Sequence, residues 1–454
     1  MAVLVLLIGA FAVFVAARGL PSTVRRLAAL CFVFHLLGAA AQVWMHLDYY
    51  GGGDMMTYMR NGQPIVRLLQ SDLSHWFWEW LKLLMHLDNE LPYVHGAGST
   101  SGTMVGLAAG AVYVFDKPLP LWEVCFIAAA TSTLGQVWFC KAAVEMFDAQ
   151  WHKVVAGGIL LVPSVIFWSS ALMKEAVALP FLAILLASTV ALMKGRWVRG
   201  LFGIVLGIVG VGLVKGYLLM PFVLAVAAAA YVGKNAGAKK KLGWPYAVAA
   251  FGIAVLGLAA ISTFMPQYAP GAIAENTAHY QQTYELLETN GQGGSNVDLG
   301  DDGTDVSMAA QVKRVPLATI NALFRPMFFE ARSIVQLAAS FETLAIVILT
   351  IRLLRFGPRQ ALAAITQSPA LTFCAVFVLA FSVAVGLSTL NLGTLSRYRI
   401  PMMPFFTVLL FVLGQQRKAA TATATRAVEL PGRAALRAAA ARNRARIMAQ
   451  RRRA

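Results

Sequence analysis

Long uninterrupted apolar runs constrain the fold of this chain more than any other feature. A helix needs about 20 mostly apolar residues to cross the hydrocarbon core of a bilayer. No strand-like alternation accompanies the runs, so they are typical of spanning helices rather than of barrel strands. We mark eleven of them: 1–17, 27–46, 121–147, 152–170, 172–193, 200–214, 216–233, 245–265, 333–355, 370–390 and 399–415. The sequence therefore predicts an all-α, polytopic transmembrane helical bundle of about eleven spans.

Composition supports the same class and locates the excess charge. The chain is 58% hydrophobic and 13% charged, against about 25% charged residues in soluble domains. Of the net charge of +17, much lies after residue 416, where eleven lysines and arginines face one glutamate. Such a segment is typical of a cytoplasmic tail held against anionic lipid headgroups, and we expect no nucleic-acid partner. We divide the chain into a transmembrane domain, 1–415, and a basic cytoplasmic tail, 416–454.

The short loops predict the orientation in the membrane. With eleven spans, four basic loops fall on the same side as the tail, which the positive-inside rule places in the cytoplasm. They are Arg18 with Arg25 and Arg26, Lys194 with Arg196 and Arg199, Lys234 with Lys239–Lys241, and Arg352 with Arg355 and Arg359. Two long acidic loops, 47–120 and 266–332, fall on the other side. We expect a multi-pass protein of the bacterial inner membrane, with a periplasmic N-terminus and a cytoplasmic C-terminus.

The first long loop opens with the segment LDYYGGGDMMTYMRNG, residues 47–62. Three glycines precede Asp54, Asp48 lies before them, and Tyr58 follows one helical turn later. A helix that starts near Asp54 would either use this carboxylate as a cap or present it at its positive end.

Other segments of the two long loops suggest interfacial or mobile structure. Residues 64–87 contain Trp76, Trp78 and Trp80 and predict an interfacial helix, or else an amphipathic helix packed on the spans. The Gly-rich piece 103–115 is apolar but short, as expected of a re-entrant or interfacial segment. The stretch 291–305 is polar and rich in glycine and aspartate. It partly matches a calcium loop, but it lacks the terminal glutamate.

Four groups of polar residues share the predicted outer face, where an ionisable side chain at membrane level needs a partner or a function. Lys174–Glu175 could be a mutual surface pair, Arg325 and Glu330 could brace their loop, and Arg397 with Arg399 could be anchors. Two arginines flanking a tyrosine also suit a phosphate, which guanidinium groups bind in a bidentate manner. The candidate site residues are Asp48, Asp54, Tyr58, Lys174, Glu175, Arg325, Glu330, Arg397 and Arg399.

At these residues the chain resembles a known family. The chain is similar to the GT-C superfamily of polytopic glycosyltransferases in three features. These are the segment GGGDMMTYMRNG after an early span, an interfacial helix behind it, and the late segment SRYRIPMMP. FWSSALMKEA and LFRPMFFEA resemble an uncharacterised bacterial branch of that group. The chain departs from the family pattern in an extra N-terminal helix, in a single acid where adjacent pairs are common, and in the lack of a sizeable C-terminal outer domain.

The resemblance implies an inverting sugar transfer from a polyprenyl-phosphate-linked donor to a glycan or lipid acceptor. Asp54 would be the general base, and Arg397 and Arg399 would stabilise the leaving phosphate. Tyr58 and Lys174–Glu175 would position the sugar or the phosphate. A divalent metal, Mg or Mn, could join Asp54, although the sequence offers no second ligand.

Three other interpretations remain open at this stage. A polymerase of O-antigen or exopolysaccharide repeat units needs the same basic residues. A lipid or solute transporter would show paired halves and broken helices, and a structural membrane subunit would leave the outer groups unexplained. The four cysteines, Cys31, Cys125, Cys140 and Cys374, lie in apolar runs and are expected to be packing residues.

Overall fold

The computed structural model describes residues 1–92, 94–236 and 308–417, together with a few single positions between 275 and 299. Every regular element in this part of the chain is a helix, so the predicted all-α fold is confirmed. The predicted span 245–265, the aspartates between 298 and 305, and the tail beyond residue 417 lie outside the described residues.

Seven helical stretches in the described ranges are long and apolar enough to cross a membrane, which makes this a multi-pass membrane protein. Two more apolar helices, α1 (Ala2–Ala17) and α5 (Thr100–Phe115), are shorter. The seven stretches are Ser22–Tyr49, Leu121–Met146, Lys174–Met193, Trp197–Gly233, Ile334–Arg355, Pro369–Ser388 and Leu392–Arg417. They contain α2 (Ser22–Trp44), α6 (Leu121–Met146), α9 (Lys174–Met193), α10 (Trp197–Lys215), most of α11 (Leu219–Ala236) and of α15 (Ile334–Phe356), α17 (Pro369–Ser388) and α18 (Leu392–Tyr398).

The predicted single span 152–170 is wrong. The structure has two short helices there, α7 (His152–Leu160) and α8 (Pro163–Trp168). Proline disfavours the helical conformation in the residue before it, and Val162 is accordingly extended, with φ −82° and ψ 113°. Glu342 on α15 stabilises the restart, because its carboxylate accepts hydrogen bonds from the Ser164 amide at 2.8 Å and the Ser164 hydroxyl at 2.6 Å.

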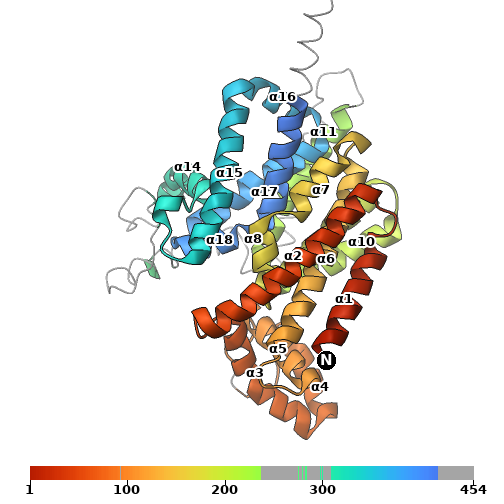
Figure 1. Ribbon diagram of the computed structural model, residues 1–454, viewed down its shortest axis with the longest axis vertical. Helices are drawn as coiled ribbons and strands as arrows, with labels where there is room; N and C mark the ends of the chain where they lie inside the picture. Colours follow the sequence, from red (N-terminus) through yellow and green to blue (C-terminus); the bar gives the residue numbers. More distant parts are fainter. Residues whose placement is uncertain are drawn as a thin grey trace, which may run out of the picture.

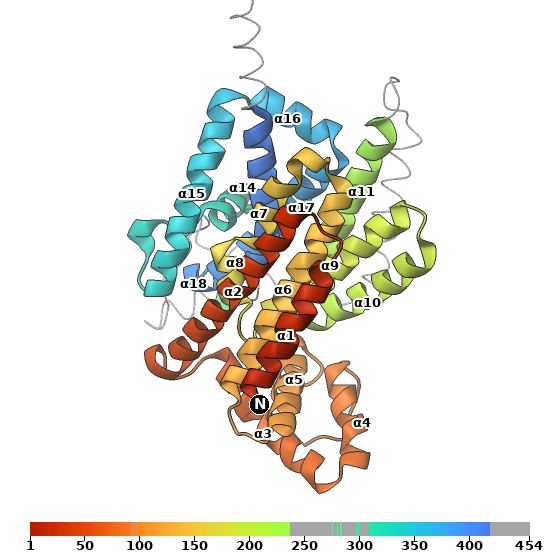
Figure 2. The same cartoon turned by 45° about the vertical axis from the view of Figure 1, so that its right-hand side comes forward.

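A layer of three helices lies at one end of the spanning helices, as Figures 1 and 2 show. It consists of α3 (Asp54–Ser71), α4 (Leu73–Leu84) and α5. The prediction of a single interfacial helix over 64–87 is wrong, because two helices cover this segment. Asp72 follows the end of α3 and caps α4, where its carboxylate accepts hydrogen bonds from the amides of Ser74 and His75. Small residues bring α3 and α5 close together, and a Cβ on Gly62 would lie 3.1 Å from Ala109.

Basic residues gather at the opposite end. Lys194, after α9, lies 3.2 Å from the Glu145 carboxylate near the end of α6, and Arg196 pairs with the same carboxylate. Arg417 donates to the Arg352 carbonyl at 3.1 Å near α16 (Pro358–Gln367), which lies far from the α3–α5 layer in both views (Figures 1 and 2). These basic residues thus lie at the end of the helices away from the α3–α5 layer.

Candidate functional site

Asp54 is positioned by the glycine turn before it. Gly51 and Gly53 have φ values of 61° and 132°, which favour glycine. A Cβ on Gly53 would come within 2.8 Å of the His46 ring, so the turn also needs glycine for close approach. Asp54 is the first residue of α3, Gly53 is its N-cap, and no side chain caps this helix end. The carboxylate is therefore available to another partner and does not act as a helix cap.

That partner is Arg397 on α18. Its NH1 donates to Oδ2 of Asp54 at 2.6 Å, although the two residues lie 343 positions apart. The Asp54 side chain is 42% exposed and the Arg397 side chain 22% exposed, so the pair lies at an accessible edge rather than inside the core. The structure thus brings together the early acid and one of the two late arginines.

Arg397 also contacts a second acid and two aromatic rings. Its Nε lies 3.8 Å from Oε1 of Glu175, and its guanidinium carbon lies 5.8 Å from the Trp168 ring and 5.4 Å from the Tyr398 ring. Although Nε is buried, it has no hydrogen-bond partner in the described part of the chain. This nitrogen thus faces the Glu175 carboxylate from beyond hydrogen-bond distance.

Glu175 belongs to a buried ion pair that the sequence analysis did not assign to the site. Lys215, at the end of α10, donates to its Oε1 at 2.7 Å, and the two side chains are 1% and 2% exposed. Lys215 Nζ also lies 5.0 Å from the centre of the Tyr398 ring. A charge at the end of an apolar run was the available signal for Lys215, because such residues need a partner or a function.

Lys174 does not pair with its neighbour Glu175. Its ammonium donates to the Thr100 hydroxyl at 2.8 Å and lies 3.4 Å from the Ser101 hydroxyl, at the start of α5. The alternative of a mutual surface pair is therefore wrong, and Lys174 instead ties α9 to the α3–α5 layer. With Lys174, Lys215 and Arg397 facing Asp54 and Glu175, the cluster carries one excess positive charge.

Tyr58 follows Asp54 on the next turn of α3 and is half-buried. Burial, with the nearby Asp54 carboxylate, raises the pKa of its phenol well above the ordinary value. Tyr58 therefore stays protonated and can donate a hydrogen bond beside Asp54 and Arg397. Asp48 is exposed on the π-helix η1 (Met45–Tyr49), which precedes the glycine turn.

Arg399 does not join this cluster. It is 0% exposed, and it donates to the Arg325 carbonyl at 2.7 Å and to the Thr343 hydroxyl at 2.8 Å. Arg397 and Arg399 are two positions apart. Residues with this spacing on an α-helix are about 200° apart around its axis, so their side chains point to opposite sides. Arg399 therefore holds the segment around Arg325 against α15.

Arg325 and Glu330 form an ion pair with each other, and Glu330 also accepts from the Met327 amide at 2.8 Å. This is the loop brace that the sequence left as an alternative. In the described residues, no hydrogen bond or ion pair links Arg325, Glu330 or Arg399 to Asp54.

In the described ranges, no three His, Cys, Asp or Glu side chains come close enough together to hold a metal ion by themselves. The two acids of the cluster, Asp54 and Glu175, instead share Arg397. Positive charge at this site is supplied by guanidinium and ammonium groups.

Comparisons with family models, with curated proteins and with solved structures give no match to this chain.

Proposed function

We propose that this protein is a membrane glycosyltransferase of the GT-C kind, acting at the outer face of a bacterial inner membrane. It would transfer a sugar from a polyprenyl-phosphate-linked donor to a glycan or lipid acceptor. The observation that supports this most is the 2.6 Å contact between Asp54 and Arg397, next to the buried Glu175–Lys215 pair. Such a reaction needs a base for the acceptor proton and a cation for the leaving phosphate. Asp54 and Arg397 place a carboxylate and a cation at one partly exposed edge.

Arg397 is the proposed phosphate ligand. Guanidinium groups bind phosphate oxygens through two donors, and the Nε of Arg397 makes no hydrogen bond in the described residues. As the bond between the anomeric carbon and the phosphate oxygen breaks, negative charge grows on the leaving phosphate. A cation held in place by Glu175 stabilises that charge.

Asp54 is the proposed general base. The acceptor hydroxyl attacks the anomeric carbon from the face opposite the phosphate, and its proton passes to the Asp54 carboxylate. In the structure this carboxylate is paired with Arg397. A donor phosphate that binds Arg397 would compete with Asp54 and release the carboxylate for the acceptor.

The other polar groups would orient the substrates. Tyr58 is a neutral donor for a sugar or phosphate oxygen, and Asp48 lies exposed beyond it. Lys174 adds positive charge at the start of α5. Lys215 stabilises Glu175 and, through it, the position of Arg397.

The test is glycan profiling of a strain that lacks the gene and is complemented with wild type, Asp54→Asn or Asp88→Asn. Asp88 is an exposed acid of the same outer segment and serves as the matched control. We expect loss of the glycan with Asp54→Asn only, since general base catalysis contributes about 10²–10⁴-fold. Full activity of Asp54→Asn at wild-type expression would remove the assignment.

A lipid or solute transporter is the second candidate, and one observation favours it. The break between α7 and α8 interrupts an otherwise apolar run, and broken helices are typical of transporter binding sites. Purified protein in sealed vesicles separates the two candidates. Release of polyprenyl phosphate from a sugar donor supports the transferase, whereas uptake without bond cleavage supports the transporter.

A further inference from the structure

Lys174 is a cation that no carboxylate pairs with in the described residues. Its ammonium donates to the Thr100 hydroxyl at 2.8 Å and lies 3.4 Å from the Ser101 hydroxyl. The adjacent acid, Glu175, pairs with Lys215 instead. Lys174 and Thr100 are half-buried, so water screens this charge only in part. A charge taken out of water needs a counter-charge, and this ammonium has only neutral partners.

The position of Lys174 adds to the shortage of negative charge. Lys174 is the first residue of α9, and Thr100 is the first residue of α5. The start of a helix is the positive end of its dipole, which favours an anion and disfavours a cation. The first turn of α5 has no acid, and the acid in the first turn of α9 is Glu175, which is paired with Lys215. A bound anion would therefore stabilise this arrangement.

The two hydroxyls beside Lys174 are available as donors. An ammonium can only donate, so the Thr100 and Ser101 oxygens accept from it and keep their own protons for another acceptor. In the described ranges, neither hydroxyl donates to a protein group. The two hydroxyl oxygens lie within 3.4 Å of one ammonium, so the three groups converge on a single position that a phosphate can occupy.

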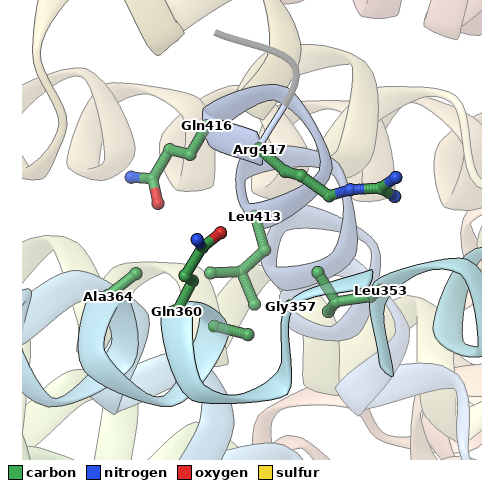
Figure 3. A pocket seen from close by; sticks show the side chains of 8 residues that line it. Leu353, Gly357, Gln360, Ala364, Leu413, Gln416 and Arg417 are labelled. Carbon is green, nitrogen blue, oxygen red and sulfur yellow. The ribbon is translucent and has the colours of Figure 1, made fainter. Parts of the chain in front are cut away.

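Convergence distinguishes this group from a pocket at the basic end of the molecule. That pocket has a volume of about 210 Å³, and its lining includes Leu413, Gln360, Gln416 and Arg417. In Figure 3 the Arg417 side chain extends away from the Gln360 and Gln416 amides. Its polar groups do not gather around one point, and the pocket therefore selects no anion.

The position beside Lys174 is next to the proposed phosphate ligand Arg397. Glu175 follows Lys174 in α9, and its carboxylate lies 3.8 Å from Nε of Arg397. Consecutive residues of a helix point about 100° apart around its axis, so Lys174 and Arg397 lie at neighbouring sides of the start of α9. Lys174 is also close enough to interact electrostatically with Arg397 and Asp54. The cluster thus offers two cationic positions rather than one.

We propose that the donor sugar is linked to its lipid through a diphosphate. The phosphate attached to the sugar would bind Arg397, and the next phosphate would bind Lys174, Thr100 and Ser101. This inference rests on the proposed function and specifies its donor. Two bridged phosphates carry more negative charge than one, which suits a cluster with an excess positive charge and a cation that lacks a carboxylate.

The reaction stays balanced with this donor. The acceptor oxygen forms a bond to the anomeric carbon and gives its proton to Asp54. The bond between the anomeric carbon and the diphosphate oxygen breaks, and the electron pair leaves with that oxygen. The products are the glycosylated acceptor and the polyprenyl diphosphate, whose new charge lies beside Arg397.

Binding of short prenyl probes to the purified full-length protein in detergent tests the donor class. Isothermal titration calorimetry compares farnesyl diphosphate, farnesyl phosphate and inorganic diphosphate, without sugar and without turnover. We expect wild type to bind farnesyl diphosphate about tenfold tighter than farnesyl phosphate, which corresponds to one hydrogen bond to a charged group. Inorganic diphosphate should bind more weakly than farnesyl diphosphate, because it has no apolar chain to bury.

Variants assign the difference to residues. Lys174→Met should remove the preference for the diphosphate and leave the affinity for farnesyl phosphate unchanged, whereas Arg397→Gln should weaken both. Arg67→Met removes an exposed charge from α3 in the same outer layer and should change neither affinity. If Lys174→Met does not fold, Thr100→Val keeps every charge and should lower the affinity for farnesyl diphosphate alone.

Three results would overturn the proposal. The first is equal affinity of wild type for farnesyl phosphate and farnesyl diphosphate. The second is an equal loss for both probes in Lys174→Met, or a loss that Arg67→Met reproduces, either of which would indicate general positive charge. The third is inorganic diphosphate binding as tightly as farnesyl diphosphate, which would indicate a soluble ligand.

The glycan test of Asp54→Asn fails or succeeds separately, because binding of these probes needs no general base. If Asp54→Asn keeps full activity while Lys174 selects the diphosphate, the assigned base is wrong and the diphosphate site stands. If Asp54→Asn is inactive and wild type does not distinguish the two prenyl probes, the transferase stands with a donor that has one phosphate.

Discussion

Lys215 and Glu175 lie 20 residues on either side of Gly195, and their side chains meet at 2.7 Å with almost no exposure to solvent. Gly195, with φ 76°, lies in the turn between α9 and α10. Because the two helices run antiparallel from this turn, residues equally distant from it come side by side. The pairing follows from hairpin geometry and places a buried charge pair behind Arg397.

Removing one partner of this pair should be strongly destabilising. Lys215→Met leaves the buried Glu175 without its hydrogen-bonded counter-charge and with only Arg397 at 3.8 Å, at a cost of about 3–5 kcal/mol in the free energy of unfolding. The double variant Lys215→Met/Glu175→Gln should recover much of that loss, because no charge is left unpaired. Thermal unfolding of the purified protein in detergent measures both effects.

The matched control for that experiment is Lys194→Met. Lys194 pairs with Glu145 at 3.2 Å, but its side chain is 48% exposed. The cost should be under about 1 kcal/mol, as for other surface pairs. Equal losses of unfolding free energy in Lys194→Met and Lys215→Met would contradict the claim that burial makes the Lys215–Glu175 pair costly to break.

The two late arginines should separate into a functional and a structural residue. Arg397→Gln should abolish sugar transfer with a small loss of stability, because its partner Asp54 stays partly exposed to water. Arg399→Gln should lower stability by about 2–4 kcal/mol, since it removes bonds of a buried charged donor to Arg325 and Thr343. Thermal unfolding and donor-binding measurements on both variants test this. A stable but inactive Arg399→Gln would restore Arg399 to the site.

Patterns along the sequence predicted the class of fold and part of the site. Apolar runs and basic loops depend on local composition, so they indicated the spanning helices and one consistent orientation. That orientation placed Asp54 and Arg397 on one face, and the structure has them in contact. The break at Val162 was missed because the apolar run continues through it, although Pro163 was a visible signal.

Pairings between distant helices were not predictable in the same way. Nothing local distinguishes Arg397 from Arg399, although helical geometry requires that they face different sides. Lys174 and Glu175 are neighbours in sequence, yet their partners are Thr100 and Lys215, which only tertiary packing supplies. The partners of Lys174 and Glu175 could therefore be identified only from the structure.

Helix packing around α14 (Met308–Phe324) should depend on one glycine. A Cβ on Gly386 of α17 would lie 2.1 Å from the Ala318 carbonyl oxygen on α14, so Gly386→Ala must push the helices apart. We expect a loss of about 1–3 kcal/mol, typical of overpacking. Gly414→Ala is the control, because no atom lies within 4 Å of the added Cβ, and it should be neutral or stabilising by about 0.5–1 kcal/mol. Equal melting temperatures for the two variants would contradict close contact between α14 and α17.

Cysteine labelling in whole cells should reveal the orientation in the membrane. The four native cysteines are free and buried, so an impermeant maleimide should label the wild type weakly. Asp88→Cys lies in the outer segment and should be labelled in intact cells, whereas Arg26→Cys should be labelled only after the inner membrane is permeabilised. Both positions are exposed, so a difference between them reports sidedness rather than burial. The reverse pattern would place Asp54 and Arg397 on the cytoplasmic side, where a polyprenyl-phosphate donor facing the periplasm would be out of reach.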